Sequence, residues 1–185
     1  MRIEEKNRHE IEARLAKMGD YVKMDYLNDC LKSNLDFDTR KFVLIRLAGI
    51  YESRKMHHEA GKLYKIIAEL STSIQSKIND YLKSGEFFIK AGKFNEADLS
   101  FDRALGIANA TQKFEIDRAK KEFYKTQARA YLTRSKRRNA MEIYEKLMAL
   151  SLSIEERNEI KSALLELYKD LGKVREFGLL KGRQS

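Results

Sequence analysis

The sequence predicts an all-α fold, an antiparallel helix-hairpin solenoid of four to five hairpins. Three observations predict it. The 185 residues include no proline and only nine glycines, which suits a chain that is helical nearly throughout, because proline cannot donate the helical hydrogen bond. Apolar residues recur at spacings of three and four, the period of an amphipathic helix. The same order of apolar and turn residues also returns after 80 residues.

Turn residues as well as apolar residues recur after 80 positions. The matched pairs are Tyr51 and Tyr131, Ala60 and Ala140, Tyr64 and Tyr144, Gly92 and Gly172, and Lys93 and Lys173. Ala97 lies 37 residues after Ala60, and Ala140 lies 43 residues after Ala97. Phe177 follows after a further 37. A duplicated pair of hairpins explains this order, and the alternative is chance periodicity in a helical bundle rich in Lys, Glu and Leu.

Residues 1–34 are expected to form an N-terminal hairpin, a degenerate or capping unit of the array. A first helix spans residues 2–18, and a second begins at the turn before Asp20, a good N-cap, and ends by about Ser33. The apolar faces of the two helices are Ile11, Leu15 and Met18, followed by Tyr21, Met24, Leu27 and Leu31. Cys30, the only cysteine, falls on the same buried face, which favours a structural role over a reactive one.

Residues 35–185 are expected to hold the repeat array. Its units lie at about 41–73, 74–110, 111–152 and 153–180. Asp36 and Asp38 are possible caps for the helix that opens the first of these units. Ser153 and Glu156 have the spacing of a capping box, in which each side chain bonds a free backbone N–H at the helix start.

Residues 78–105 carry the clearest single pattern. Its defining positions are Tyr81, Ser84, Gly85 and Phe88, then the turn at Gly92, then Ala97, Phe101 and Ala104. This order resembles the tetratricopeptide repeat, a two-helix unit with the signature W-x2-L-G-x2-Y…A-x3-F, with Tyr81 in place of the Trp and Ser84 in place of the Leu. Gly85 leaves room for a neighbouring helix to come close. The units are longer than the usual 34 residues, by three and by nine.

The resemblance implies a right-handed superhelix in which the first helix of each unit lines a concave, partner-binding groove. By helical facing, the groove residues would be Ile45, Glu52, Asn79, Leu82, Lys83, Glu86, Lys90, Lys125, Arg129 and Thr133, with Gly49, Ser162 and Glu166 on the same face. Some members of the family clamp a C-terminal carboxylate with Lys and Asn. Gly49 and Glu86 stand where the Asn residues would be, so we do not expect that clamp.

The positive charge is unevenly distributed. The formal net charge is +9, and residues 113–138 hold ten Lys or Arg against three acidic residues. Four of these cations crowd one turn, namely Arg134, Lys136, Arg137 and Arg138. The stretch is either a solvated helix face with a charged loop or a site for an acidic partner or a phosphate backbone.

The sequence offers no pattern for catalysis. The glycines are too far apart for a phosphate loop, and the adjacent His57 and His58 would diverge by about 100° on a helix. The aromatic stripe could stack nucleic-acid bases, but every position is one expected to pack in the core: Tyr51, Tyr64, Phe88, Phe101, Tyr131 and Tyr144. We therefore expect no enzyme activity, no metal and no cofactor.

These observations favour a non-catalytic protein-interaction module or adaptor that binds a peptide or helix of acidic character. The alternative is a nucleic-acid-binding or regulatory scaffold that uses residues 113–138. No apolar run approaches the ~20 residues of a membrane span, and no signal peptide is recognised at the start. A single cysteine suits a reducing cytoplasm.

Overall fold

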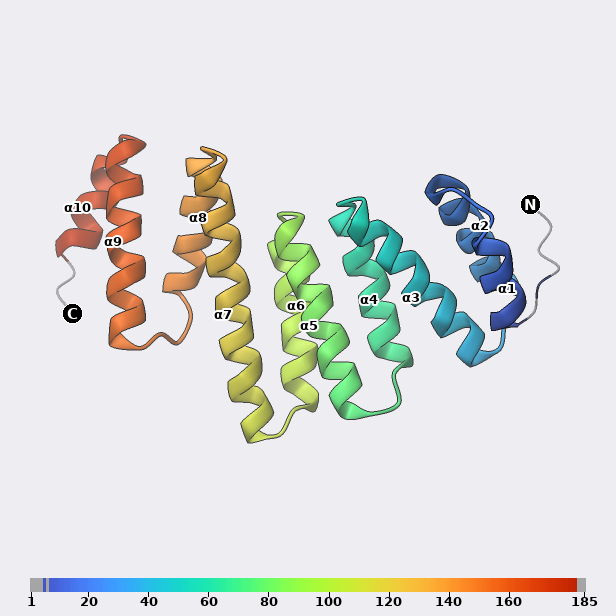
Figure 1. The fold of residues 1–185 in the computed structure, drawn as a ribbon. Coiled ribbons are helices and arrows are strands. Elements are labelled where there is room, and N and C mark those ends of the chain that lie inside the picture. Colours follow the sequence, from blue (N-terminus) through green and yellow to red (C-terminus); the bar gives the residue numbers. More distant parts are fainter. Residues whose placement is uncertain (1–4, 6, 183–185) are drawn as a thin grey trace. The chain divides into compact units, whose positions relative to one another are not determined.

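The protein is all-helical. The computed structural model describes residue 5 and residues 7–182, and no β-strand occurs among them. The helices are α1 (Arg8–Leu15), α2 (Asp20–Lys32), α3 (Phe37–Ser53), α4 (His57–Leu70), α5 (Ile74–Lys90), α6 (Phe94–Ile107), α7 (Ala110–Thr133), α8 (Arg137–Met148), α9 (Ile154–Asp170) and α10 (Val174–Gly182). Successive helices form antiparallel hairpins (Figure 1), which confirms the predicted fold class.

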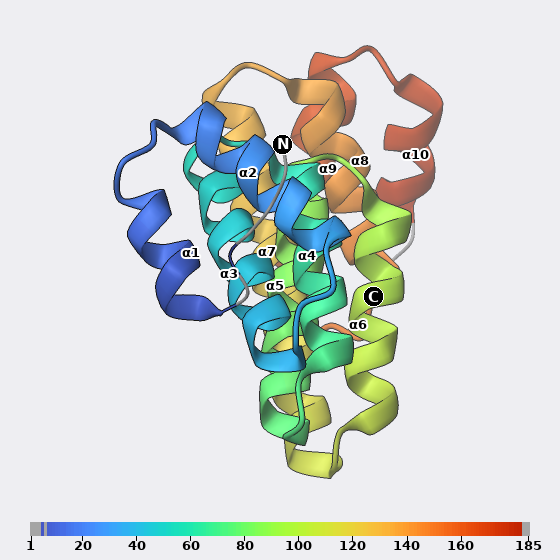
Figure 2. The same cartoon turned by 90° about the vertical axis from the view of Figure 1, so that its right-hand side faces the viewer.

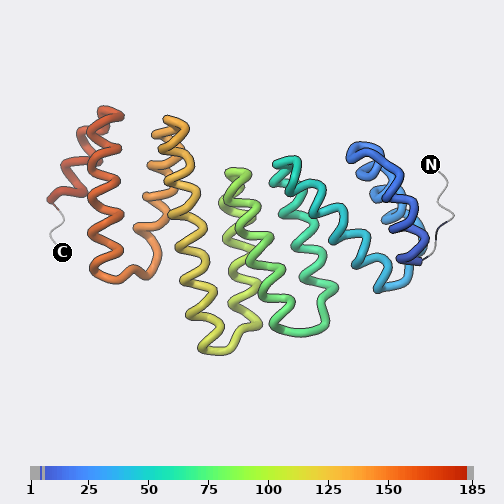
Figure 3. Tube along the Cα trace, viewed as in Figure 1, coloured from blue at the N-terminus to red at the C-terminus, as the bar shows by residue number. Residues whose placement is uncertain are grey.

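The chain divides into two compact units, residues 1–117 and residues 118–185, with α7 crossing the boundary. In the first unit, α4 packs between α3 and α5, and α5 packs on α6. Figure 2 shows α3 and α5 on one side of this unit and α4 and α6 on the other. In the second unit, α9 packs against both α8 and α10. The tube in Figure 3 follows the alternation of helix and turn within each unit.

Four hairpin turns share one backbone geometry. Each places one residue in the left-handed region, with φ of 59° at Lys55, 71° at Gly92, 56° at Ser135 and 68° at Gly172. These positions are separated by 37, 43 and 37 residues, the intervals found in the sequence. In each turn, the next N–H donates to the carbonyl of an aromatic residue: Met56 to Tyr51 (2.8 Å), Lys93 to Phe88 (2.8 Å), Lys136 to Tyr131 (2.9 Å) and Lys173 to Tyr168 (2.8 Å).

This is the Schellman closure of a helix C-terminus, in which left-handed backbone lets two orphan carbonyls find donors. The second bond is present in every turn, from the left-handed residue to the carbonyl three residues earlier, as from Ser135 to Leu132 at 2.9 Å. The 80-residue recurrence is therefore a recurrence of backbone conformation as well as of residue type.

Side-chain caps start the first helix of several hairpins. Asp36 accepts from the Thr39 N–H at 2.9 Å, so one of the two expected caps is used. The predicted capping box of Ser153 and Glu156 is confirmed, with both reciprocal bonds present. Further caps not foreseen in the sequence are Ser73, which accepts from the Ser76 N–H, and Asn109, which accepts from the Gln112 N–H.

The core of the first unit depends on small residues between helices. A Cβ placed on Gly85 would lie 2.5 Å from Cζ of Phe101, and one on Gly61 would lie 3.0 Å from the ring of Phe88. Beside them, the buried Ser84 hydroxyl donates to the Gly61 carbonyl at 2.8 Å, so a polar group is satisfied at the position of the signature Leu. The expectation that Gly85 is a close-packing position is confirmed.

The aromatic stripe belongs to the core, as predicted. Its members are buried at Tyr64, Phe88, Phe101, Tyr131 and Tyr144, and half-buried at Tyr51. Their faces are covered by neighbouring helices, as when Tyr64 stacks on Phe87 with ring centroids 5.4 Å apart. The five buried rings are therefore not available as a platform for stacking bases.

The second helix of the N-terminal hairpin differs from its prediction in two ways. Asp20 is the first helical residue and not the N-cap; Gly19 occupies the cap position, in extended backbone, and its carbonyl accepts from the Lys23 N–H at 2.9 Å. Tyr21 is 68% exposed, whereas Tyr26 is buried in its stead. The reason is that α2 turns Tyr26, Leu27 and Cys30 towards the core, a face rotated from the expected stripe.

Other expectations for this hairpin are confirmed. Ile11, Leu15 and Cys30 are buried, and Met18 packs against them. The first helix is shorter than expected, Arg8–Leu15 against 2–18. Residues 1–4 and 6 lie outside the described residues, so the predicted start of that helix falls where nothing is described.

Candidate partner-binding surface

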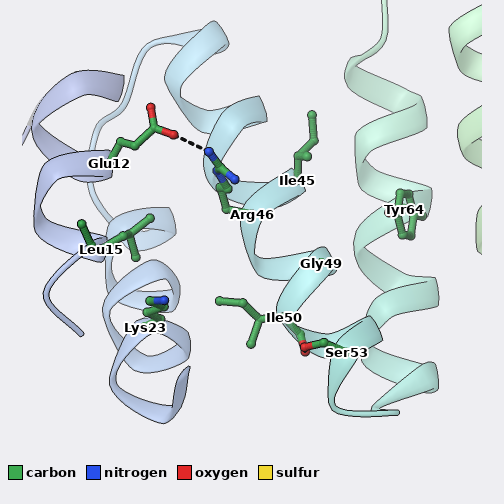
Figure 4. A pocket seen from close by; sticks show the side chains of 10 residues that line it. Glu12, Leu15, Lys23, Ile45, Arg46, Gly49, Ile50, Ser53 and Tyr64 are labelled. Atoms are coloured by element: carbon green, nitrogen blue, oxygen red, sulfur yellow. Dashed lines mark hydrogen bonds and ion pairs between the residues drawn. The ribbon is translucent and has the colours of Figure 1, made fainter. Parts of the chain in front are cut away.

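A pocket of about 570 Å³ opens on the first unit between the N-terminal hairpin and α3 (Figure 4). Ten residues line it: Glu12, Leu15, Ala16, Lys23, Ile45, Arg46, Gly49, Ile50, Ser53 and Tyr64. Two of them, Ile45 and Gly49, lie on the helix face that the sequence assigned to the groove. Its volume falls within the range of protein ligand pockets, roughly 300–1,000 Å³.

The wall formed by α3 is apolar and open. Ile45 is 46% exposed although it lies in the middle of a helix. One turn further on, a Cβ added to Gly49 would meet no atom within 4 Å. Because no described residue covers either position, the helix backbone and an isoleucine side chain are accessible to an incoming group.

Charged groups border this apolar wall. Arg46 and Glu12 form an ion pair across α3 and α1 (Figure 4). No local pattern predicts this pair, because the two residues are 34 positions apart on different hairpins. Lys23 of α2 also lines the pocket. An apolar centre with a charged border is the arrangement found at protein–protein interfaces.

Tyr64 connects the pocket to α5. Its hydroxyl-bearing ring is buried, and this burial raises the pKa of the phenol. Lys83, predicted as a groove residue, places its ammonium 5.0 Å from the centre of the Tyr64 ring. No carboxylate lies within 4 Å of that ammonium in the described part of the chain.

The remaining groove residues predicted for the first unit lie on α3 and α5. Glu52 and Asn79 are exposed, and the Asn79 Oδ1 accepts from Gln75 at 3.1 Å. Leu82 is half-buried. Glu86 and Lys90 form an ion pair at 2.7 Å, one helical turn apart.

In the second unit, the predicted groove residues of α7 are partly engaged within the unit. Lys125 is only 8% exposed and lies 3.1 Å from Glu156, which also binds Lys121 at 2.9 Å. Lys125 is therefore neutralised by its own chain, which the sequence did not reveal. Arg129 lies 3.5 Å from Glu159, and the Thr133 hydroxyl donates to the Ala130 carbonyl at 3.0 Å.

Glu156 accepts hydrogen bonds from two sets of donors, and these explain why it is ionised. Its carboxylate accepts from Lys121 and Lys125 on α7 and from the backbone N–H of Ser153 in the capping box. The Lys121 hydrogen bond contributes most, and together these donors lower the pKa of Glu156 to about 2. The side chain thus holds the start of α9 against α7.

The basic turn predicted at residues 134–138 lies between α7 and α8. Arg134, Lys136, Arg137 and Arg138 are all exposed there. The Nε of Arg137 lies 3.2 Å from Asp170 Oδ2 on α9. A shallow depression of about 330 Å³ opens beside the turn and is lined by Ser135, Lys136, Arg137, Arg138, Asn139, Asp170 and Leu171.

The described residues include no group of three or more His, Cys, Asp or Glu side chains placed to hold a metal ion. His57 and His58 both rest against phenylalanine rings, at 6.0 Å from Phe87 and 5.9 Å from Phe88. None of the helices described is both long and apolar enough to span a bilayer.

No family model matches the chain, and no curated protein matches it. The likeness to tetratricopeptide repeats therefore rests on the residues of the chain itself.

Proposed function

We propose that the chain is a non-catalytic protein-interaction module, a tetratricopeptide-like adaptor that binds a peptide or helix of another protein. The binding surface would be the face of α3 and α5 in the first unit, centred on the pocket beside Ile45. The observation that carries this proposal is the uncovered apolar wall of α3, where Ile45 is exposed and Gly49 borders open space.

The shape and chemistry of the pocket favour a side chain of a partner as the occupant. Its apolar wall can take an aliphatic or aromatic group, and burial of such an anchor contributes about 1.5–3 kcal/mol. Among its charged groups, Glu12 and Arg46 are paired with each other, so neither is poised as a lone acid or base. An anchored segment of a protein partner fits this better than a reacting substrate.

The partner is expected to carry acidic residues beside its anchor. Lys83 lies on the neighbouring helix with its ammonium over Tyr64, a residue that lines the pocket. A carboxylate of the partner could pair with this ammonium while its apolar neighbour enters the pocket. We further propose a reducing, cytoplasmic setting, because the one cysteine of the sequence is a buried free thiol.

A matched pair of glycine substitutions tests the site. Gly49 and Gly106 are both helical glycines at which an added Cβ meets nothing within 4 Å, but only Gly49 lines the pocket. The ligand would be a peptide selected from a display library with the full chain as bait. A partner captured from the native cell and shortened to its binding segment would serve equally. Its affinity would be measured by calorimetry. Gly49→Trp should fill the pocket and weaken binding by about tenfold or more, whereas Gly106→Trp should bind like the parent chain.

Equal affinities for the two tryptophan variants would contradict the proposed site. Failure to enrich any peptide or protein above background would contradict the proposed function itself. A Lys83→Gln variant tests the charge of the partner. If the partner contributes a carboxylate, the variant should bind more weakly than the parent chain at low salt, and the two affinities should become equal at high salt.

A further inference from the structure

Two basic turns lie side by side in the second unit. The α7–α8 turn meets the α9–α10 turn, as the ion pair of Arg137 with Asp170 and the shared depression show. We call segments 134–139 and 169–176 together the basic edge. It holds seven Lys or Arg residues and two carboxylates.

Both carboxylates of the basic edge are already engaged. Asp170 pairs with Arg137 at 3.2 Å, and Glu176 pairs with Lys173 at 3.4 Å. Among the residues that the structure describes, the other five cations have no carboxylate within 4 Å: Arg134, Lys136, Arg138, Lys169 and Arg175. All five are exposed.

This surplus distinguishes the basic edge from the part of α7 that packs against α9. On α7, Lys121 and Lys125 are neutralised by Glu156, and Arg129 lies beside Glu159. Three of the ten cations that the sequence shows between residues 113 and 138 therefore pair with carboxylates of α9. Three of the cations without a paired carboxylate, Arg134, Lys136 and Arg138, gather at one turn.

The first unit provides an internal comparison, because its turns have the same backbone geometry at an offset of 80 residues. The corresponding segments, 54–59 and 89–96, carry four Lys or Arg and two carboxylates. Two of those four cations are occupied: Arg54 lies 3.6 Å from the centre of the Tyr21 ring, and Lys90 pairs with Glu86. The fold thus makes this turn without a dense positive charge, so the turn geometry does not explain the basic edge.

We propose that the basic edge binds the phosphate backbone of a nucleic acid without reading its base sequence. The depression there is lined by six polar or charged residues and one leucine, so it lacks the apolar centre of a protein interface. Three of its four clustered cations on the α7–α8 turn are arginines, whose planar guanidinium matches a phosphate in two hydrogen bonds. The inference is independent of the pocket in the first unit.

Charge-matched variants of the full chain test this binding. The probe is a fluorescently labelled single-stranded RNA of about 20 nucleotides and mixed sequence, with the DNA of the same sequence as a second probe. Anisotropy titrations would compare the parent chain with Arg134→Gln/Lys136→Gln/Arg138→Gln. The control, Lys55→Gln/Lys62→Gln/Lys93→Gln, removes the same charge from exposed positions of the first unit.

The parent chain should bind both probes, with an affinity that falls as salt rises. Each phosphate contact contributes about −0.7 to the slope of log K against log salt for a single strand, so the triple variant should lose about two units of slope. Its affinity at about 50 mM salt should fall tenfold or more, while the control variant keeps most of its affinity. Asp170→Asn, which removes a carboxylate and releases Arg137, should bind more tightly than the parent.

Three results would overturn the proposal. One is the absence of salt-dependent binding to either probe by the parent chain. Another is an equal loss of affinity in the two triple variants, which would reduce the effect to net charge. The third is that polyglutamate or vesicles containing phosphatidylserine bind as tightly as RNA and depend on the same residues. Circular dichroism melts of all variants would show that each remains folded.

Discussion

Gly85 and Phe101 are in contact only because Gly85 has no side chain. A Cβ at residue 85 would lie 2.5 Å from Cζ of the Phe101 ring, and that ring is 0% exposed. The approach of α5 to α6 therefore depends on one missing methyl group. Since the ring is enclosed on all sides, it cannot move away cheaply.

Gly85→Ala should accordingly lower the free energy of unfolding by about 1–3 kcal/mol, the usual cost of overpacking a core. Gly106→Ala is the control, since that glycine is also helical but faces open space. It should raise stability by about 0.5–1 kcal/mol through the entropy of the unfolded chain. Urea denaturation followed by circular dichroism measures both. Changes of the same sign at the two sites would refute this account of the α5–α6 contact.

The two left-handed positions occupied by non-glycine residues offer the opposite test. Lys55 and Ser135 have φ of 59° and 56°, a conformation that costs most side chains roughly 1–2 kcal/mol. Part of any gain from glycine is offset by about 0.4–1 kcal/mol of extra entropy in the unfolded chain. We expect Ser135→Gly and Lys55→Gly each to raise stability by up to about 1 kcal/mol.

The control for this prediction is Ala91→Gly, because Ala91 is the C-cap residue of α5 and has a φ of −81°. Glycine there relieves no strain and should destabilise the protein by about 0.5–1 kcal/mol. Melting temperatures that fall in all three variants would mean that the left-handed turns are not strained.

The Glu156 carboxylate should make the free energy of unfolding depend on pH in the acid range. Its folded-state pKa of about 2 lies below the ordinary 4.5, so its contribution is present in full above pH 4.5. It is lost as the pH falls from 4.5 towards 2. Glu156→Gln should cost about 1–2 kcal/mol at neutral pH, from weakened charged hydrogen bonds. In urea titrations at successive pH values, the gap between parent and variant should narrow below pH 4.5.

Glu159→Gln is the matched control, because Glu159 and its partner Arg129 are 60% and 61% exposed. That pair should contribute little at any pH, as solvent-exposed ion pairs usually do. A gap between the parent and Glu156→Gln that stays constant down to pH 2 would exclude the carboxylate as its source.

The features that the sequence predicted well are those encoded by nearby residues. Helix faces follow from spacings of three and four, the capping box of Ser153 and Glu156 from a local pattern, and the tight packing at Gly85 from a repeat signature. The turns at Gly92 and Gly172 were recognisable because glycine adopts left-handed backbone readily. The turns at Lys55 and Ser135 have the same geometry, but they contain no glycine from which it could be predicted.

What the sequence could not predict depends on partners from distant segments. The helical facing predicts Lys125 as a groove residue, but Glu156, 31 positions later in the chain, lies beside it and pairs with it. Tyr21 had the spacing of a core residue, yet the face chosen by α2 was decided by its packing on α3. The pocket beside Ile45 exists only once α1 and α2 are placed beside α3, which no periodicity specifies.

Because Cys30 is buried, the reaction of its thiol with a dye reports local unfolding of the N-terminal hairpin. Its thiol is 0% exposed, and burial also raises the pKa of the thiol, so a thiol-reactive dye cannot react while α2 is docked. Labelling must wait for α2 to separate from α3, and its rate therefore measures how often that separation occurs. Because the sequence has a single cysteine, every labelled molecule records the same event. The labelling rate of the unsubstituted chain therefore measures local unfolding at one end of the first unit.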